Sequence, residues 1–311
     1  MRIDIYERVT NAIIEELEKG VRPWMKPWNS EHAAGRITRP LRSNMVPYQG
    51  INVLMLWSES VARGYASPIW MTFKQALEFG GHVRNGEKGT PVVFASKLTR
   101  TETAESGEAL ERDISFLKCY AVFNTEQIDG LPGQFNQPVP ERSDPVQRIA
   151  HADAYMTACG ADIAHGGTMA AYNITTDRVR MPPFEAFRDA ESYYATLAHE
   201  LTHWTRHKSR LDRDFGRARF GDEGYAMEEL VAELGSAFVC ADLDLTPALH
   251  AENAAYIDNW LSVLKGDKRA IFTAASHAQR AADFLHGLQP TAEDGLVLFA
   301  SAEANRQAAV T

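Results

Sequence analysis

The chain has 311 residues, of which 45% are hydrophobic and 23% are charged, a composition that excludes a disordered chain, a collagen and a coiled coil. No apolar run approaches the ~20 residues that cross a bilayer, and the N-terminus carries acids in place of the apolar core of a signal peptide. The three cysteines are far apart and have no metal-binding spacing. We therefore expect a cytoplasmic protein without disulfides that makes no contact with membranes.

Charge is distributed unevenly along this acidic chain. The formal net charge is -9 and the isoelectric point is about 5.6, which argues against a nucleic-acid partner for the chain as a whole. Residues 19–100, however, contain 12 Lys and Arg against 4 Glu and no Asp. A local basic region of this kind is typical of a nucleic-acid-binding surface.

The first part of the chain mixes helical and strand patterns. Apolar residues at helical spacing predict helices over residues 5–17 and 51–63, which end at Gly20 and Gly64. Thr72 and Gln75 form a capping-box pattern that predicts a third helix ending at the glycine pair 80–81. Strands are expected over 90–97 and 114–124, with an acidic, solvated loop between them. These patterns predict an α+β domain over residues 1–128.

Residues 129–145 contain four prolines and two glycines and show almost no apolar periodicity. We interpret this stretch as a linker, followed by a second domain over residues 146–311. The second domain is expected to be mostly helical, with a short hairpin or edge strand near 170–181. The predicted helices cover residues 144–159, 190–208, 225–241, 251–265 and 268–288.

The second domain contains a candidate metal site. His199 and His203 flank Glu200 in an HExxH motif inside a helical pattern. Side chains four residues apart share a helix face, so both imidazoles can bind one ion, while Glu200 can meet a water as general base. This spacing is typical of metal-assisted hydrolysis with zinc, one ion per chain, although another divalent metal could occupy such a site.

The next predicted helix offers the remaining carboxylates. We assign Glu229 as the third ligand and Glu233 as an acceptor that orients the ring N–H of a ligand histidine, with Glu228 as the competing candidate for third ligand. His207 lies too far along the helix axis to share the ion. Arg206 and Tyr225 are candidate oxyanion stabilisers. The strand around 171–174 could hold an extended peptide by edge pairing, as a peptidase requires.

The basic region also contains four of the six tryptophans of the chain. Aromatic rings interleaved with cations are typical of proteins that bind single-stranded nucleic acid, because bases stack on the rings while the cations meet phosphates. We expect Phe94 to lie in the core. The candidate DNA contacts are Arg22, Trp24, Lys26, Trp28, Arg36, Arg39, Arg42, Tyr48, Trp70, Arg84 and Lys88.

With both sets of residues in view, the chain resembles the ArdC family of plasmid antirestriction proteins. The resemblance covers nearly the whole chain and is carried by residues 23–28, 48–52, 70–75, 122–124, 199–204 and 228–233. It implies an N-terminal single-stranded-DNA-binding domain and a C-terminal zincin-like, gluzincin-type metallopeptidase domain. It also implies an accessory role in conjugation, protecting incoming DNA from restriction, with His199, His203 and Glu229 as metal ligands and Glu200 as base.

Two classes of function fit these residues. In the first, a zinc metallopeptidase is brought to single-stranded DNA and cleaves a protein there, such as a restriction-enzyme subunit; a protease that removes proteins from DNA fits equally. In the second, a non-catalytic protein coats the strand and its metal site is structural or vestigial. A structural zinc site normally has a fourth protein ligand, and no such residue is evident here, which favours the catalytic interpretation.

Overall fold

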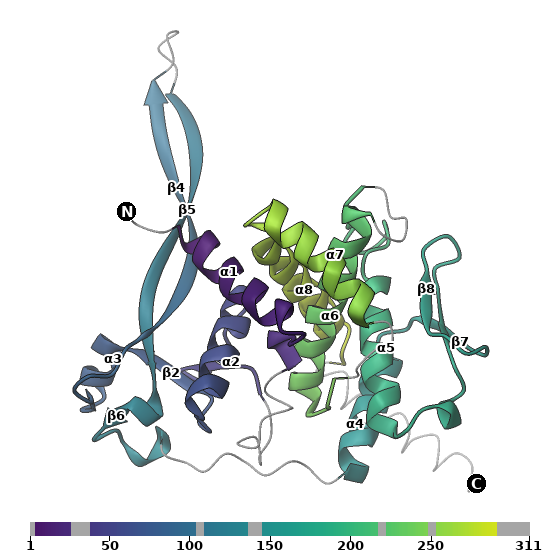
Figure 1. The fold of residues 1–311 in the computed structure, drawn as a ribbon, viewed down its shortest axis with the longest axis horizontal. Helices are drawn as coiled ribbons and strands as arrows, with labels where there is room; N and C mark the ends of the chain where they lie inside the picture. Colours follow the sequence, from purple (N-terminus) through teal and green to yellow (C-terminus); the bar gives the residue numbers. More distant parts are fainter. Residues whose placement is uncertain are drawn as a thin grey trace, which may run out of the picture.

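The described residues form three sheets, and most of the helices lie between the N-terminal sheets and the C-terminal one (Figure 1). The fold is α+β with two domains, as predicted. The computed structural model describes residues 4–25, 38–103, 109–135, 145–216, 222–247 and 253–290. The helices are α1 (Ile5–Glu18), α2 (Ile51–Arg63), α3 (Phe73–Glu78), α4 (Pro145–Ala158), α5 (Ala190–Trp204), α6 (Glu223–Leu243), α7 (Asn253–Gly266) and α8 (Ala270–Gly287). The strands are β1 (Leu41–Arg42), β2 (Ile69–Thr72), β3 (His82–Val83), β4 (Thr90–Thr103), β5 (Ala109–Asn124), β6 (Ile128–Asp129), β7 (Asp162–His165), β8 (Ala171–Asn173) and β9 (Arg178–Met181).

The three predicted N-terminal helices are confirmed with their termini. Gly64 ends α2 in the left-handed conformation at φ 70°, a backbone position that glycine adopts without strain. At the start of α3, the Thr72 hydroxyl accepts from the Gln75 N–H and the Gln75 side chain accepts from the Thr72 N–H. This capping box satisfies N–H groups that no helical turn could reach.

The largest sheet has the order β1-β2-β5-β4, with β1 parallel to β2 and the other pairs antiparallel. Strands β4 and β5 form one long hairpin that extends away from the helices (Figure 1). The expected solvated loop is therefore much shorter than predicted, because residues up to Thr103 and from Ala109 continue the ladder. Thr99, Thr101 and Thr103 are β-branched residues that suit a strand despite the charged residues between them.

A second, smaller hydrophobic core lies beside β3 and β6, which pair antiparallel. It buries Leu131 and Phe135 from the stretch interpreted as a linker. Because these two side chains pack with Met71 and Ile128, residues 129–135 belong physically to the N-terminal half, and the predicted linker begins too early. The domain limits otherwise stay a prediction, and residues 136–144 lie outside the described residues.

The C-terminal half confirms the predicted hairpin and adds a strand that was not predicted. Strand β8 pairs antiparallel with β9, and β7 pairs parallel with the other side of β9. Helix α5 ends at Trp204, before the expected residue 208. The reason is local, since Thr205 Oγ1 and Arg213 Nη2 both donate to the Thr202 carbonyl, at 2.6 and 2.9 Å, and take an acceptor that a further helical turn would use.

Close packing of α5 against α6 positions the candidate site. A Cβ atom at Gly235 of α6 would lie 2.6 Å from Cγ2 of Thr202 on α5, so only glycine permits this approach. The main core is continuous between the two halves of the chain, with α1 against α7 and α2 against α8. None of the described helices is long and apolar enough to cross a membrane.

Candidate metal centre and cleft

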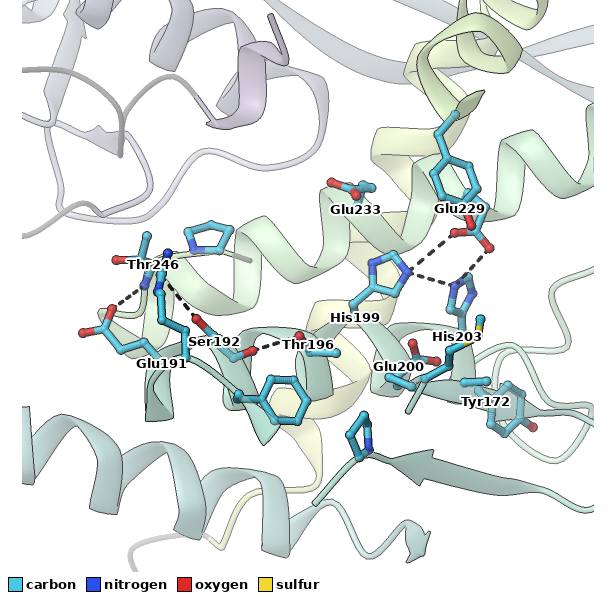
Figure 2. Close-up of a pocket in the computed structure, with 18 of the residues that line it drawn as sticks. Tyr172, Glu191, Ser192, Thr196, His199, Glu200, His203, Glu229, Glu233 and Thr246 are labelled. Atoms are coloured by element: carbon cyan, nitrogen blue, oxygen red, sulfur yellow. Dashed lines mark hydrogen bonds and ion pairs between the residues drawn. The ribbon is translucent and has the colours of Figure 1, made fainter. Parts of the chain in front are cut away.

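Helix α5, which carries the HExxH motif, begins at a capping residue and lines a cleft. The Asp189 carboxylate accepts from the Ser192 N–H at 2.7 Å and fixes the first turn. The hydrogen bond that the Ser192 hydroxyl donates is the largest of the interactions that lower the pKa of Asp189 to about 2. Two turns further along, His199 and His203 lie on the helix face that looks toward α6 (Figure 2).

The structure brings His199, His203 and Glu229 together. The two Nε2 atoms are 3.2 Å apart. Glu229 Oε2 lies 3.6 Å from His199 Nε2, and Glu229 Oε1 lies 3.5 Å from His203 Nε2. Ligand atoms bound tetrahedrally at zinc distances are about 3.3 Å from one another. Glu229 uses a different oxygen in each of these two distances, and one ligand atom from each of the three residues lies within 4.8 Å of the others. The three side chains are therefore close enough to share one ion, and their donor atoms suit zinc.

The electrostatics of this cluster favour a cation. Burial lowers the pKa of His203, but the carboxylates of Glu229 and Glu228 outweigh it and raise that pKa to about 10. Burial raises the pKa of Glu229 and the two histidines lower it by more. Among the described residues, the buried Glu200 Oε2 has no hydrogen-bond partner. A cleft that stabilises positive charge and leaves a carboxylate oxygen unsatisfied fits a divalent ion with a water beside it.

Glu228 is the carboxylate that contacts Nδ1 of His203, and the prediction that Glu233 orients a histidine of the candidate site is wrong. Glu228 Oε1 lies 3.1 Å from His203 Nδ1, so the ring donates there and turns Nε2 toward the site. Arg213 fixes Glu228 with two bonds of 2.8 Å. Glu233 points elsewhere and accepts from Arg22 of the N-terminal half.

The cleft around the site has a volume of about 1480 Å³, enough for several residues of an extended peptide. Strand β8 lies along one side of the cleft. Within the described residues it pairs only with β9, so its other edge faces the cleft. Both Arg206 and Tyr225 line the cleft, as their predicted role would require. Beyond α5, His207 Nδ1 meets Ser209 Oγ at 2.7 Å, away from the metal site.

Several predicted DNA contacts are wrong because their side chains are buried. Trp24 and Trp70 are 0% exposed and Tyr48 is 3% exposed, so no base can stack on these rings. Arg22 and Arg39 are also buried, in ion pairs with the C-terminal half. The prediction treated Trp24, which follows a proline, as exposed, whereas this ring packs on Trp260 of α7.

Other predicted contacts are exposed or lie outside the described residues. Arg42, Arg84 and Lys88 are exposed, and Arg84 forms an ion pair with Glu87 at 2.9 Å. The predicted contacts outside the described residues are Lys26, Trp28 and Arg36.

An exposed aromatic pair on the sheet was missed. Phe94 is 53% exposed and Tyr120 is 40% exposed, so the prediction that Phe94 lies in the core is wrong. Tyr120 is opposite Val92 and Phe94 is opposite Lys118, which places both rings on one face of β4 and β5. The strand register places Arg42, opposite Trp70 and through it Asn124, on the same face of the sheet. The register of the hairpin, which sequence spacing alone did not determine, was the missing signal.

The fold and the site define a two-domain protein with a zincin-like metallopeptidase domain. Residues 150–277 match the family described as zincin-like metallopeptidase, and residues 3–123 match the N-terminal domain of anti-restriction factor ArdC. The chain belongs to the ArdC family of antirestriction proteins, as the sequence resemblance predicted. The matched zincin-like family is one of metallopeptidases, and one solved structure of a relative contains Mn(II).

Relatives match most of this chain. The metal-free crystal structure of the antirestriction protein ArdC from plasmid R388 is 46% identical, with a TM-score of 0.77, and the match covers 92% of this chain and 98% of that one. Its Mn(II)-bound structure gives a TM-score of 0.74 at 45% identity, with the same coverage. An uncharacterized protein of Sinorhizobium fredii, y4eC, is 42% identical over 93% of this chain and 94% of its own length. DNA primase TraC of Escherichia coli is 38% identical over 90% of this chain, which spans only 27% of TraC.

Proposed function

We propose that the protein is a zinc metallopeptidase whose N-terminal half binds single-stranded DNA. The observation that carries the peptidase proposal is the convergence of His199, His203 and Glu229, whose ligand atoms lie within 4.8 Å of one another, with Glu200 Oε2 unsatisfied in the same cleft. Three protein ligands leave one position open, which is the arrangement of catalytic rather than structural zinc.

The roles of the chain's own residues follow from their positions. A divalent ion bound by the three ligands supplies Lewis-acid chemistry, which activates a water and polarises the scissile carbonyl. Glu200 takes a proton from the attacking water and returns it to the leaving amine. The edge of β8 pairs with the peptide main chain and holds it extended across the cleft. Tyr225, on the cleft wall, donates to the oxyanion that develops at the carbonyl.

Metal content and cleavage of an unstructured protein test this proposal together. The full chain loaded with Zn²⁺ or Mn²⁺ should cleave casein, and a chelator should stop the cleavage. His199→Ala and Glu229→Ala should lose both bound metal and cleavage, because two ligands hold an ion poorly. An exposed histidine outside the site, His82→Ala, serves as the matched control. Full metal occupancy in Glu229→Ala would contradict the assignment of the third ligand.

For DNA binding we propose the exposed face formed by Arg42, Phe94, Lys118 and Tyr120. Its two rings offer stacking surfaces for bases, and its two cations lie where a phosphate backbone would pass. Stacking contributes about 1–3 kcal/mol per base and tolerates any sequence, since every base has an aromatic face. The N-terminal half should therefore prefer single strands to duplex and show little sequence preference.

A paired substitution tests this face against its opposite side. Phe94→Ala with Tyr120→Ala should weaken binding of an oligo(dT) strand about tenfold or more, because two stacking surfaces are lost. Phe73 is a matched control: it is 51% exposed but contacts Phe123, which points to the other face of β5. Equal losses in the Phe73→Ala variant and the double variant would contradict the proposed surface.

Antirestriction would then combine the two halves, with the DNA-bound chain cleaving a protein at the strand, such as a restriction-enzyme subunit. The exposed aromatic face also supports the alternative, in which the protein protects DNA by coating it. A restriction assay in cells separates them. Loss of protection in Glu200→Gln indicates proteolysis, whereas loss only in the variant lacking Phe94 and Tyr120 indicates coating.

A further inference from the structure

Glu233 is a buried carboxylate in the cleft wall that the peptidase mechanism does not use. It follows Glu229 on α6 by one helical turn and lines the same cleft. Arg22 Nη1 donates to both Glu233 oxygens at 3.3 Å, and Trp24 Nε1 donates to Oε2 at 3.3 Å. The side chains of Arg22 and Glu233 are only 6% and 7% exposed. Both donors belong to the N-terminal half, so that half contributes directly to the peptidase cleft.

The segment that provides these donors is fixed against the C-terminal helices. Trp24 is completely buried and meets Trp260 of α7 edge to face, with 5.5 Å between ring centres. Tyr256 stacks on Trp260 and lines the cleft. Met25, the next residue, lines the cleft as well. The burial against Trp260 of Trp24, two residues along the chain from Arg22, therefore holds Arg22 beside Glu233.

The position of Glu233 makes it a potential fourth metal ligand. Residues one turn apart on a helix lie about 6 Å apart along its axis and on nearly the same face. A flexible carboxylate at that distance, if it lacked other donors, would be drawn toward a divalent ion held by His199, His203 and Glu229. A fourth protein ligand would turn an open catalytic site into a closed structural one.

We propose that Arg22 is a positioning residue that keeps the metal site open by holding Glu233 away from it. The inference rests on the proposed metal site and extends it, because it makes the N-terminal half necessary for an open coordination position. Trp24 supports the same arrangement as the second donor to Glu233. A peptidase cleft without Arg22 would bind its ion more tightly and turn over more slowly.

Opposite changes in metal affinity and turnover test this role in the full chain. In Arg22→Gln, the affinity for Zn²⁺, measured by competition with a chromogenic chelator, should rise roughly tenfold or more while casein cleavage falls by a similar factor. The double variant Arg22→Gln with Glu233→Gln should return both values toward those of the parent, since no carboxylate remains to close the site. A loss of packing would instead lower affinity and turnover together, and that result would overturn the proposal.

The matched control is another buried ion pair between the two halves. Arg39 Nη2 lies 2.6 Å from Asp242 Oδ2 near the end of α6, far along the helix from Glu229. Arg39→Gln should leave zinc affinity and turnover unchanged; a change matching that of Arg22→Gln would contradict a specific role. If Arg22→Gln does not fold, Arg22→Lys should show the same opposite changes to a smaller extent. If no variant or parent cleaves casein, peptidase activity fails, and zinc affinity alone decides whether Arg22 withholds Glu233.

Discussion

Replacing Glu228 with glutamine should destabilise the folded protein while leaving all three proposed metal ligands in place. The Arg213 and Glu228 side chains are 1% and 2% exposed and share two hydrogen bonds of 2.8 Å. Glu228→Gln leaves the guanidinium charge buried without its counter-charge, which costs about 3–5 kcal/mol. A destabilisation of about 3 kcal/mol should lower the melting temperature of the metal-free protein by roughly 6–12 °C.

The same substitution should weaken the metal site without removing a ligand. Glu228 orients His203 through Nδ1 at 3.1 Å, and loss of such a partner typically lowers metal affinity about 10- to 100-fold. Converting both Glu228 and Arg213 to methionine should recover much of the stability, because an apolar pair replaces a buried ion pair with little cost. Affinity should stay low in that double variant, because methionine offers His203 no acceptor.

Urea unfolding and a zinc competition titration measure these two effects. The control is Asp162→Asn, which breaks an ion pair with Arg178 in which both side chains are 55% exposed; such surface pairs contribute less than about 1 kcal/mol. If Glu228→Gln destabilises the protein no more than Asp162→Asn does, the reasoning about the buried pair is refuted.

Two further predictions concern helix α5. Gly235→Ala should destabilise the protein by about 1–3 kcal/mol in urea unfolding and weaken zinc binding, because the added methyl group meets Thr202 and pushes α5 from α6. Asp189→Ala should cost about 1 kcal/mol through loss of the helix cap. Since the hydrogen bond from Ser192 lowers the pKa of Asp189 to about 2, the stabilisation by Asp189 is fully present above the unfolded-state pKa near ~4 and is lost as pH falls through about 2. Urea unfolding from pH 6 to pH 2 measures this difference.

The control for Gly235→Ala is a glycine with open space around it. Gly266→Ala adds a methyl group with no atom within 4 Å and should change unfolding little; an equal effect in both glycine variants would refute the packing argument. A gap between Asp189→Ala and the parent that stays constant down to pH 2 would contradict the role of the Asp189 charge.

Local periodicity was enough to predict the elements that carry the metal site. The HExxH spacing determines that two imidazoles share a face of α5. Helical periodicity places Glu229 on a second helix, from which its carboxylate can reach the same ion. Periodicity could not show that Glu228, and not Glu233, contacts His203. Arg213, which follows α5, fixes Glu228, and Arg22, from the N-terminal half of the chain, holds Glu233.

The N-terminal half was harder to predict because its exposed and buried rings have similar sequence surroundings. Trp24 lies between prolines and cations and resembles a surface residue, yet it packs on Trp260 from a helix that follows it by more than 200 residues. Phe94 follows Val92 in an apolar run and resembles a core residue, yet the hairpin continues past the helices that would cover it. Only the long-range packing decides which rings a ligand can reach.

Glu200 is the general base in the proposed mechanism, and the decisive measurement of that role is the cleavage rate of Glu200→Gln. Glutamine keeps the size and polarity of glutamate but cannot accept the proton, so zinc content should be unchanged and casein cleavage should fall about 10²- to 10⁴-fold. Glu185→Gln, the same change at an exposed site before α5, should cleave at the parent rate. A zinc-loaded Glu200→Gln protein that cleaves casein as fast as Glu185→Gln would contradict the role of Glu200 as general base.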